Sequence, residues 1–357
     1  MQIKSINLVK ILMVNIMSHE IDLKKYEIRT DLVDEVIENN NLNDIKISTK
    51  EYDDIKVQEI YIDKKNSKII NKKIGNYTTI IFDDITDFDN RNKVKEVFSN
   101  ELKKYIDKIG VKSDLSVLII GLGNEKSTPD ALGPLSVDNI VVTNHLYQIN
   151  QLDSGFMPVS AFVPNVTGVT GIETSELIKC AVKSVKPSFV IAIDSLASGS
   201  IDRVNKTIQI TDTGISPGSG IGNSRKEISF KTLNIPVIAI GVPTVVDATV
   251  IVSDTINYIQ KHYAFNKKFQ NNPMSKLTIS SNVNYLKENV DITIEDKKKL
   301  LGLIGCFNNE EIKELIFEVL NPIGYNLMVT PKEIDFIIDK LSDVIGNGIN
   351  HALHENI

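Results

Sequence analysis

The stretch FVIAIDSLASGS, residues 189–200, decides the fold of this chain. It begins as a short apolar run without the alternation of a half-exposed strand, and it ends in small residues. The runs VLIIGLG (117–123) and PVIAIGV (236–242) have the same character. Short continuous apolar runs bounded by Gly, Pro or Asp are typical of strands buried on both faces of a parallel sheet. These runs therefore predict an α/β fold with a mostly parallel, twisted sheet flanked by helices.

A helix is predicted between two of these strands. ETSELIKCAVKSVKP (173–187) has acidic residues near its start and lysines near its end, as the helix dipole favours. Open sheets of this kind place their functional sites at the carboxyl ends of the strands. Asp130 follows the run VLIIGLG, in STPDALGP, and Asp194 follows the apolar start of FVIAIDSLASGS, in AIDSLASGS. Two carboxylates delivered to neighbouring strand ends are the parts of an acid/base pair, so Asp130 and Asp194 are the catalytic candidates.

Composition narrows the functional class. The 357 residues carry a formal net charge of -6, which argues against a protein that neutralises nucleic-acid phosphates. Cys180 and Cys306 lie far apart without metal-ligand spacing, and the histidines form no HExxH pattern. We therefore expect no cofactor, no metal ion, no direct nucleic-acid partner and no membrane association. The apolar residues 6–17 are too few to span a bilayer.

The glycine-rich motifs have several interpretations. GLGN (121–124) departs from the dinucleotide-binding pattern, because Lys126 occupies the third glycine position. The longer stretch TDTGISPGSGIGNSRKEIS (211–229) is a candidate flap, anion-binding nest or plain surface loop. Its GISPG segment is no nucleophile elbow, since Pro217 lacks the N–H that an oxyanion hole requires.

Other charged residues are weaker candidates. Arg203, Arg225 and Lys226 are candidates to hold acidic groups of a substrate. Asp153 and Asp212 stand in DSG and DTG motifs, as in pepsin-type enzymes, but they lie too close in sequence for two β lobes. We interpret both as turn formers.

Several long motifs together identify a family. GLGNEKSTPDALGP, VIAIDSLASGSIDRVNKTIQITDTGISPGSGIGNSRKEIS, PVIAIGVPTVVDAT and MVTPKEIDFIIDKLSDVIGNGINHALH resemble the bacterial spore germination protease, or GPR endopeptidase, family. The resemblance runs from about residue 26 to the C-terminus. It implies a fold similar to hydrogenase-maturation proteases, catalytic aspartates at Asp130 and Asp194, and an atypical aspartic endopeptidase. Its substrates would be small acid-soluble spore proteins, degraded as germination begins.

The resemblance also implies a self-processing zymogen. YEIRTDLVDE (26–35) is similar to the family's processing region, which places the cut between Asp31 and Leu32. The expected organisation is an N-terminal extension and propeptide over residues 1–31 and a single α/β catalytic domain over residues 32–357, with Met1 or Met17 as the start. A homotetramer in the cytoplasm of the forespore or spore core is also implied.

Two other functions stay open at this point. A hydrogenase-maturation-like peptidase would recognise a metal ion bound in its substrate protein. Such an enzyme would require a histidine beside the carboxylates. A non-catalytic module would bind spore proteins and use the glycine-rich loop as a clamp.

Overall fold

The computed structural model describes residues 30–39, 42, 45–110, 115–218, 226–269, 285, 290, 292–320, 327–355 and 357. The chain divides into two compact units, each described here by itself. Residues 29–247 and 328–357 form one unit, an α/β body, and residues 1–28 and 248–327 form the other. The expected division at residue 31 concerns processing and stays a prediction.

One sheet organises the α/β body. Its strands run in the order β1-β2-β3-β7-β8-β6-β4-β5, and β9 also pairs with β8. β4, β5, β6 and β8 pair in parallel, whereas β7, β3, β2 and β1 continue the sheet in antiparallel fashion. The bounds are β1 Ile47–Tyr52, β2 Ile55–Ile62, β3 Gly75–Ile81, β4 Val117–Gly121, β5 Val159–Phe162, β6 Phe189–Ser198, β7 Thr207–Thr211, β8 Val237–Asp247 and β9 Met328–Val329.

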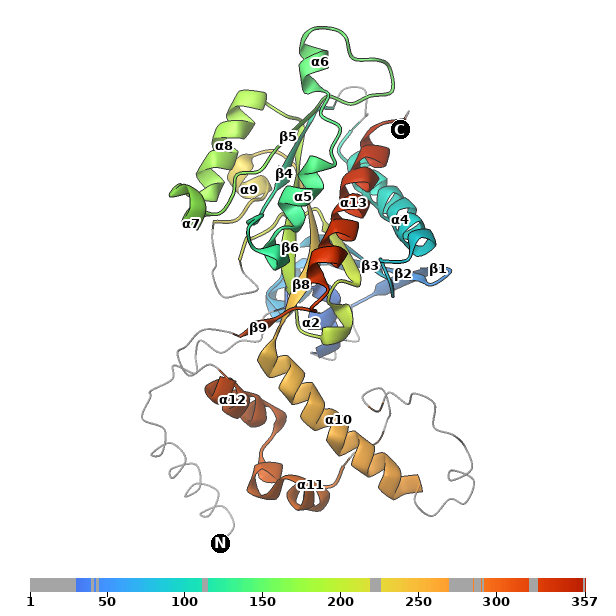
Figure 1. Ribbon diagram of the computed structural model, residues 1–357, viewed down its shortest axis with the longest axis vertical. Helices are drawn as coiled ribbons and strands as arrows, with labels where there is room; N and C mark the ends of the chain where they lie inside the picture. The colour runs from blue at the N-terminus through green and yellow to red at the C-terminus, as the bar shows by residue number, and fades with distance from the viewer. Residues whose placement is uncertain are drawn as a thin grey trace. The chain divides into compact units, whose positions relative to one another are not determined.

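Helices cover both faces of the parallel strands, as Figure 1 shows. Because successive side chains of a strand point to opposite faces, Ile119 and Ile191 join one core cluster and Ile120 and Ala192 join another. The first cluster includes residues of α4 (Phe88–Asp107) and α13 (Ile334–Leu353), and the second includes Ile178 of α8 (Thr174–Val185). The α/β fold class is confirmed, and the three apolar runs are the strands β4, β6 and β8.

A third cluster matters for the site. α2 (Val33–Asn39) and α3 (Lys64–Ile70) contribute Val33, Ile37 and Ile70, which pack with residues of β2 and β3. The antiparallel half of the sheet thus holds the chain that directly follows Asp31. The remaining helices of the body are α5 Leu132–Asp138, α6 Asn144–Gln148, α7 Thr167–Thr170 and α9 Phe230–Leu233, with 3-10 turns η3 Thr128–Asp130 and η4 Ile201–Arg203.

The second unit is helical where it is described. It contains α10 (Ala248–Phe269), α11 (Ile294–Leu301), the 3-10 turn η8 (Gly302–Cys306) and α12 (Asn309–Leu320), and α10 contacts α12. Within the described part of the chain, no helix is long and apolar enough to cross a membrane.

Candidate active site

Asp130 lies in the loop between β4 and α5. It is the last residue of η3, and its carbonyl accepts a hydrogen bond from the Asn124 amide at 3.0 Å. Gly123 has a φ of +114°, and a Cβ there would lie 2.0 Å from the Asp130 carbonyl oxygen. Glycine is therefore required at this position, because the two chain segments touch backbone to backbone. The GLGN motif thus serves to position Asp130.

Asp194 lies inside β6, not in a turn after it, because the strand continues to Ser198. The expected position of Asp194 after the apolar run, at the end of its strand, is therefore wrong in detail. The strand has a register shift against β8 between Leu196 and Ala197, as a β-bulge produces. The Asp194 side chain is buried, with 6% exposure, and its Oδ1 accepts the Ser195 amide at 3.0 Å.

The environment of Asp194 favours its protonated form. Burial raises the pKa of Asp194 well above 3.8, and the charges of Asp130 and Asp31 raise it further. A buried carboxyl with a raised pKa, beside a second carboxylate, is suited to stay protonated while the second carboxylate is ionised. The structure therefore brings together the two aspartates that the sequence analysis selected, and it adds a third carboxylate, that of Asp31.

Asp31 is held against the end of β6. Its amide donates to the Ala197 carbonyl at 3.1 Å, and its Oδ2 accepts from the Ala197 amide at 3.1 Å. Leu32 beside it is fully buried. The peptide bond between Asp31 and Leu32 thus lies three residues along β6 from Asp194, and the chain continues from it into α2.

Two residues that the sequence analysis did not select also contact this peptide. The Lys72 ammonium donates to the carbonyl oxygens of Thr30 at 2.9 Å and Asp31 at 3.1 Å. Gln209 donates from Nε2 to the Asp31 carbonyl at 3.3 Å. The one local signal for Gln209 is a polar residue between Ile208 and Ile210 in a buried strand, and Lys72 has none.

Asp34 and Glu35 of α2 are buried as well. Asp34 forms an ion pair with Arg203 at 3.0 Å. Glu35 accepts the Ser198 hydroxyl at 2.6 Å, the Gly199 amide at 2.7 Å and the Thr30 hydroxyl. Burial raises the pKa of both carboxyls, while the Arg203 charge lowers that of Asp34 and the Ser198 hydroxyl lowers that of Glu35.

The other substrate-binding candidates are not gathered at this place. Arg203 does meet an acidic group, but one of its own chain. Lys226 forms an exposed ion pair with Glu176 of α8 at 3.2 Å. Arg225 falls outside the described residues. Their role toward a substrate stays a prediction.

The two aspartates of the DSG and DTG motifs act in turns. The carboxylate of Asp212 accepts the amide of Asn76 at 2.8 Å at the start of β3. The carbonyl of Asp153 accepts the Phe156 amide at 3.4 Å.

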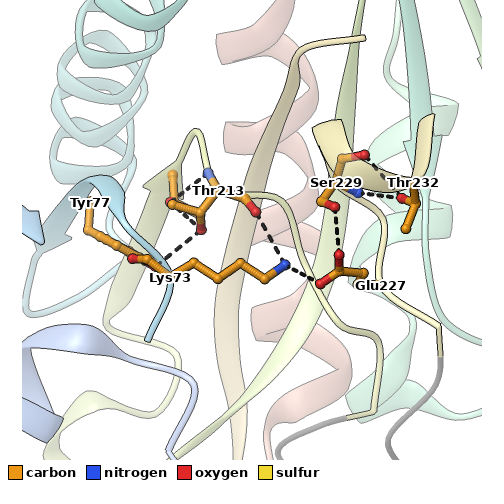
Figure 2. Close-up of polar contacts among 7 residues, drawn as sticks. Lys73, Tyr77, Thr213, Glu227, Ser229 and Thr232 are labelled. Atoms are coloured by element: carbon orange, nitrogen blue, oxygen red, sulfur yellow. Dashed lines mark hydrogen bonds and ion pairs between the residues drawn. The ribbon is translucent and has the colours of Figure 1, made fainter. Parts of the chain in front are cut away.

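One lysine joins the two ends of the glycine-rich loop. Lys73 donates to the Thr213 carbonyl at 3.4 Å and forms an ion pair with Glu227 at 2.8 Å (Figure 2). Ile215 and Ile228 pair across the loop as an antiparallel bridge. The loop therefore has a closed base just after β7, whereas its residues 219–225 lie outside the described part.

Comparison with known proteins identifies the family. A sequence model of the germination protease family, Peptidase_A25, matches residues 20–357. The chain belongs to the germination protease family. It is 46% identical to the germination protease of Bacillus licheniformis, over 95% of this chain and 96% of the relative. It is also 46% identical to that of Priestia megaterium, over 96% and 97%, and 44% identical to that of Bacillus subtilis, over 95% and 96%.

A solved structure was also found. A [NiFe] hydrogenase maturation protease, HycI, from Thermococcus kodakarensis KOD1 matches with 15% identity and a TM-score of 0.24, over 36% of this chain and 74% of that one. A score this low carries no argument.

The family assignment makes the chain a peptidase and therefore a hydrolase. Among the described residues, no group of three or more His, Cys, Asp or Glu side chains is placed to hold a metal ion.

Proposed function

We propose that this chain is an atypical aspartic endopeptidase that begins the degradation of small acid-soluble spore proteins during germination. It is made as a zymogen that cuts itself between Asp31 and Leu32. The observation that carries the proposal is the buried Asp194 carboxyl, whose pKa is raised by burial and by the charges of Asp130 and Asp31. The carboxylate of Asp31, next to the bond proposed to be cut, therefore lies within electrostatic reach of the proposed catalytic pair.

In the proposed mechanism, the two carboxyls share one proton. Asp130, ionised, takes a proton from a water molecule whose oxygen forms a bond to the carbonyl carbon of Asp31. Asp194, protonated, gives its proton to the departing nitrogen of Leu32 as the C–N bond breaks. The pair then holds one proton again, so its protonation state is restored after each turnover.

The contacts around the bond support the substrate preference for an acidic residue followed by a large apolar one. The Asp31 carboxylate accepts the Ala197 amide, which offers a site for an acidic side chain before the cut. Leu32 is fully buried, which offers an apolar site after it. We extend both sites to the spore proteins that the enzyme would cut, and we place the enzyme in the cytoplasm of the forespore or spore core as a homotetramer.

The same contacts support the proposed zymogen. While residues 30–32 lie along β6, no second polypeptide can occupy the same hydrogen-bonding groups of Ala197. Cutting after Asp31 would free this side of the site. Because one carboxyl of the pair must be protonated, self-cleavage should be faster at mildly acidic pH than at neutral pH.

The test is incubation of the purified full chain, Asp130→Asn and Asp194→Asn, alone and with a small acid-soluble spore protein, followed by mass spectrometry. We expect the wild type to lose residues up to Asp31 and then to cut the spore protein, and both variants to do neither. A chain that starts at Leu32 should be active at once. Cleavage by a pure Asp194→Asn variant would refute the pair, and binding without cutting by the wild type would favour a binding module. Light scattering tests the tetramer.

A further inference from the structure

Two side-chain donors converge on one carbonyl oxygen, that of Asp31. The Lys72 ammonium lies 3.1 Å from it and the Gln209 Nε2 lies 3.3 Å from it. The two residues come from different parts of the sheet region, since Lys72 follows α3 and Gln209 lies in the middle of β7. Within the described part of the chain, both donors reach the carbonyl of the peptide bond proposed to be cut.

Gln209 also forms a hydrogen bond with the chain beyond that peptide bond. Its Oε1 accepts the Val33 amide at 2.9 Å, so one amide group bonds to the backbone on both sides of Leu32. Gln209 is 6% exposed and is paired in the sheet with Thr79 of β3 and Gly241 of β8. A buried amide fixed in the centre of a sheet sets which peptide bond stands opposite it, because a shift by one residue would unpair both of its ends.

Lys72 is equally well fixed. The residue before it, Asn71, ends α3 in the left-handed conformation, and the Lys72 carbonyl accepts the Ser67 hydroxyl at 2.6 Å. Burial lowers the pKa of Lys72, and the charges of Asp31, Glu35 and Asp34 oppose that shift. A donor held in place in a poorly solvated site stabilises developing negative charge far better than a mobile donor in water.

We propose that Lys72 and Gln209 form the oxyanion site for cleavage after Asp31, with Gln209 also setting the register of the cut. The proposal rests on the proposed function. When water adds to the Asp31 carbonyl carbon, negative charge develops on the oxygen that both donors already face. The contacts of 3.1 and 3.3 Å lie at the long end of ordinary N–H···O hydrogen bonds and would shorten on an oxyanion.

This assignment divides the chemistry between four side chains. Lys72 and Gln209 stabilise the oxygen, so the proton of Asp194 is left for the Leu32 nitrogen, and Asp130 activates the water. The same donors would meet the carbonyl of any substrate residue that replaces Asp31 at the end of β6.

The experiment measures the first-order rate of self-cleavage of the full chain by mass spectrometry. Three variants separate the roles. Lys72→Met removes the cationic donor and keeps the length of the side chain. Gln209→Leu removes both ends of the amide, whereas Gln209→Glu keeps an acceptor for the Val33 amide and removes the donor. Lys68→Met, on the exposed face of α3 four residues before Lys72, is the matched control.

We expect Lys72→Met and Gln209→Glu each to slow cleavage by about 10²-fold or more, as loss of one oxyanion donor does elsewhere. Gln209→Leu should be slower still and should cut at additional bonds, since the register is no longer set. Lys68→Met should cut at the wild-type rate and position. Hydrogen exchange of residues 30–37 should be unchanged in Gln209→Glu, because the Val33 amide keeps its acceptor.

Each other outcome is decisive. If the wild type does not cut itself, or Asp194→Asn still does, the proposed function fails. If those two behave as proposed but Lys72→Met and Gln209→Glu both cut within about threefold of the wild-type rate, the oxyanion site is refuted alone. A slow Gln209→Glu variant whose residues 30–37 have lost their exchange protection would reduce Gln209 to a structural role. Should Lys72→Met fail to fold, Gln209→Glu decides by itself.

Discussion

The ion pair between Asp34 and Arg203 allows a stability prediction with a magnitude. Asp34 is fully buried and the Arg203 side chain is 14% exposed, with 3.0 Å between the charged groups. Removing one partner of a buried pair leaves an uncompensated charge and costs about 3–5 kcal/mol. We therefore expect Arg203→Met to lower the free energy of unfolding by about this amount at pH 7.5, in an Asp194→Asn background that prevents self-cleavage.

A control and a second variant isolate the pair. Arg91 has a similarly buried side chain, at 15% exposure, but its partner Asp343 is 45% exposed at 3.8 Å. Arg91→Met should cost no more than about 1 kcal/mol, because exposed ion pairs are worth little. Adding Asp34→Asn to Arg203→Met should recover more than half of the loss, since the buried charge is then gone.

The loss should also depend on pH. Without Arg203, the lowering influence on the pKa of Asp34 is gone, so its folded-state pKa lies further above the ordinary 3.8. A carboxyl whose pKa is higher in the folded state than in the unfolded state destabilises the protein least at a pH below the unfolded-state pKa. The destabilisation grows as the pH rises toward the folded-state pKa. Urea unfolding followed by circular dichroism at pH 5 and pH 7.5 measures this. An Arg203→Met loss equal to that of Arg91→Met, or the same at both pH values, would refute the reasoning.

Three further predictions concern the catalytic pair. The pKa of Asp194 is raised, so its ionised carboxylate destabilises the folded state more as the pH rises above 3.8. Asp194→Asn should therefore raise the melting temperature more at pH 7.5 than at pH 4.5. An equal gain at both pH values would contradict this. Gly123→Ala should slow cleavage strongly, because its Cβ would collide with the Asp130 carbonyl, whereas Gly168→Ala, with nothing within 4 Å of the new Cβ, should cut normally. Cleavage should persist in EDTA; loss of activity that zinc restores would instead favour a metal-reading peptidase.

The sequence by itself determined the elements whose signal is local. Three continuous apolar runs are the parallel strands β4, β6 and β8, because burial on both faces requires apolar residues at every position. Residues 334–353 have the i, i+3, i+4 apolar spacing of a packed helix, and they form α13. The motifs around Asp130 and Asp194 could also be recognised in the sequence, since Asp130 lies in the loop after β4 and Asp194 lies within β6.

Only the tertiary structure decided what stands around these aspartates. Asp31 meets Ala197 across 166 residues of sequence, and Gln209 meets the Asp31 carbonyl across 178. No periodicity connects such residues, because the contacts exist only after β7 has paired between β3 and β8 and residues 30–39 have packed on the antiparallel half of the sheet. The pKa of Asp194 depends on the same assembly, since burial and the approach of two other carboxylates are properties of the folded chain. The local sequence pattern determines which residues a strand contains, whereas the long-range pairing of strands determines which other residues they contact.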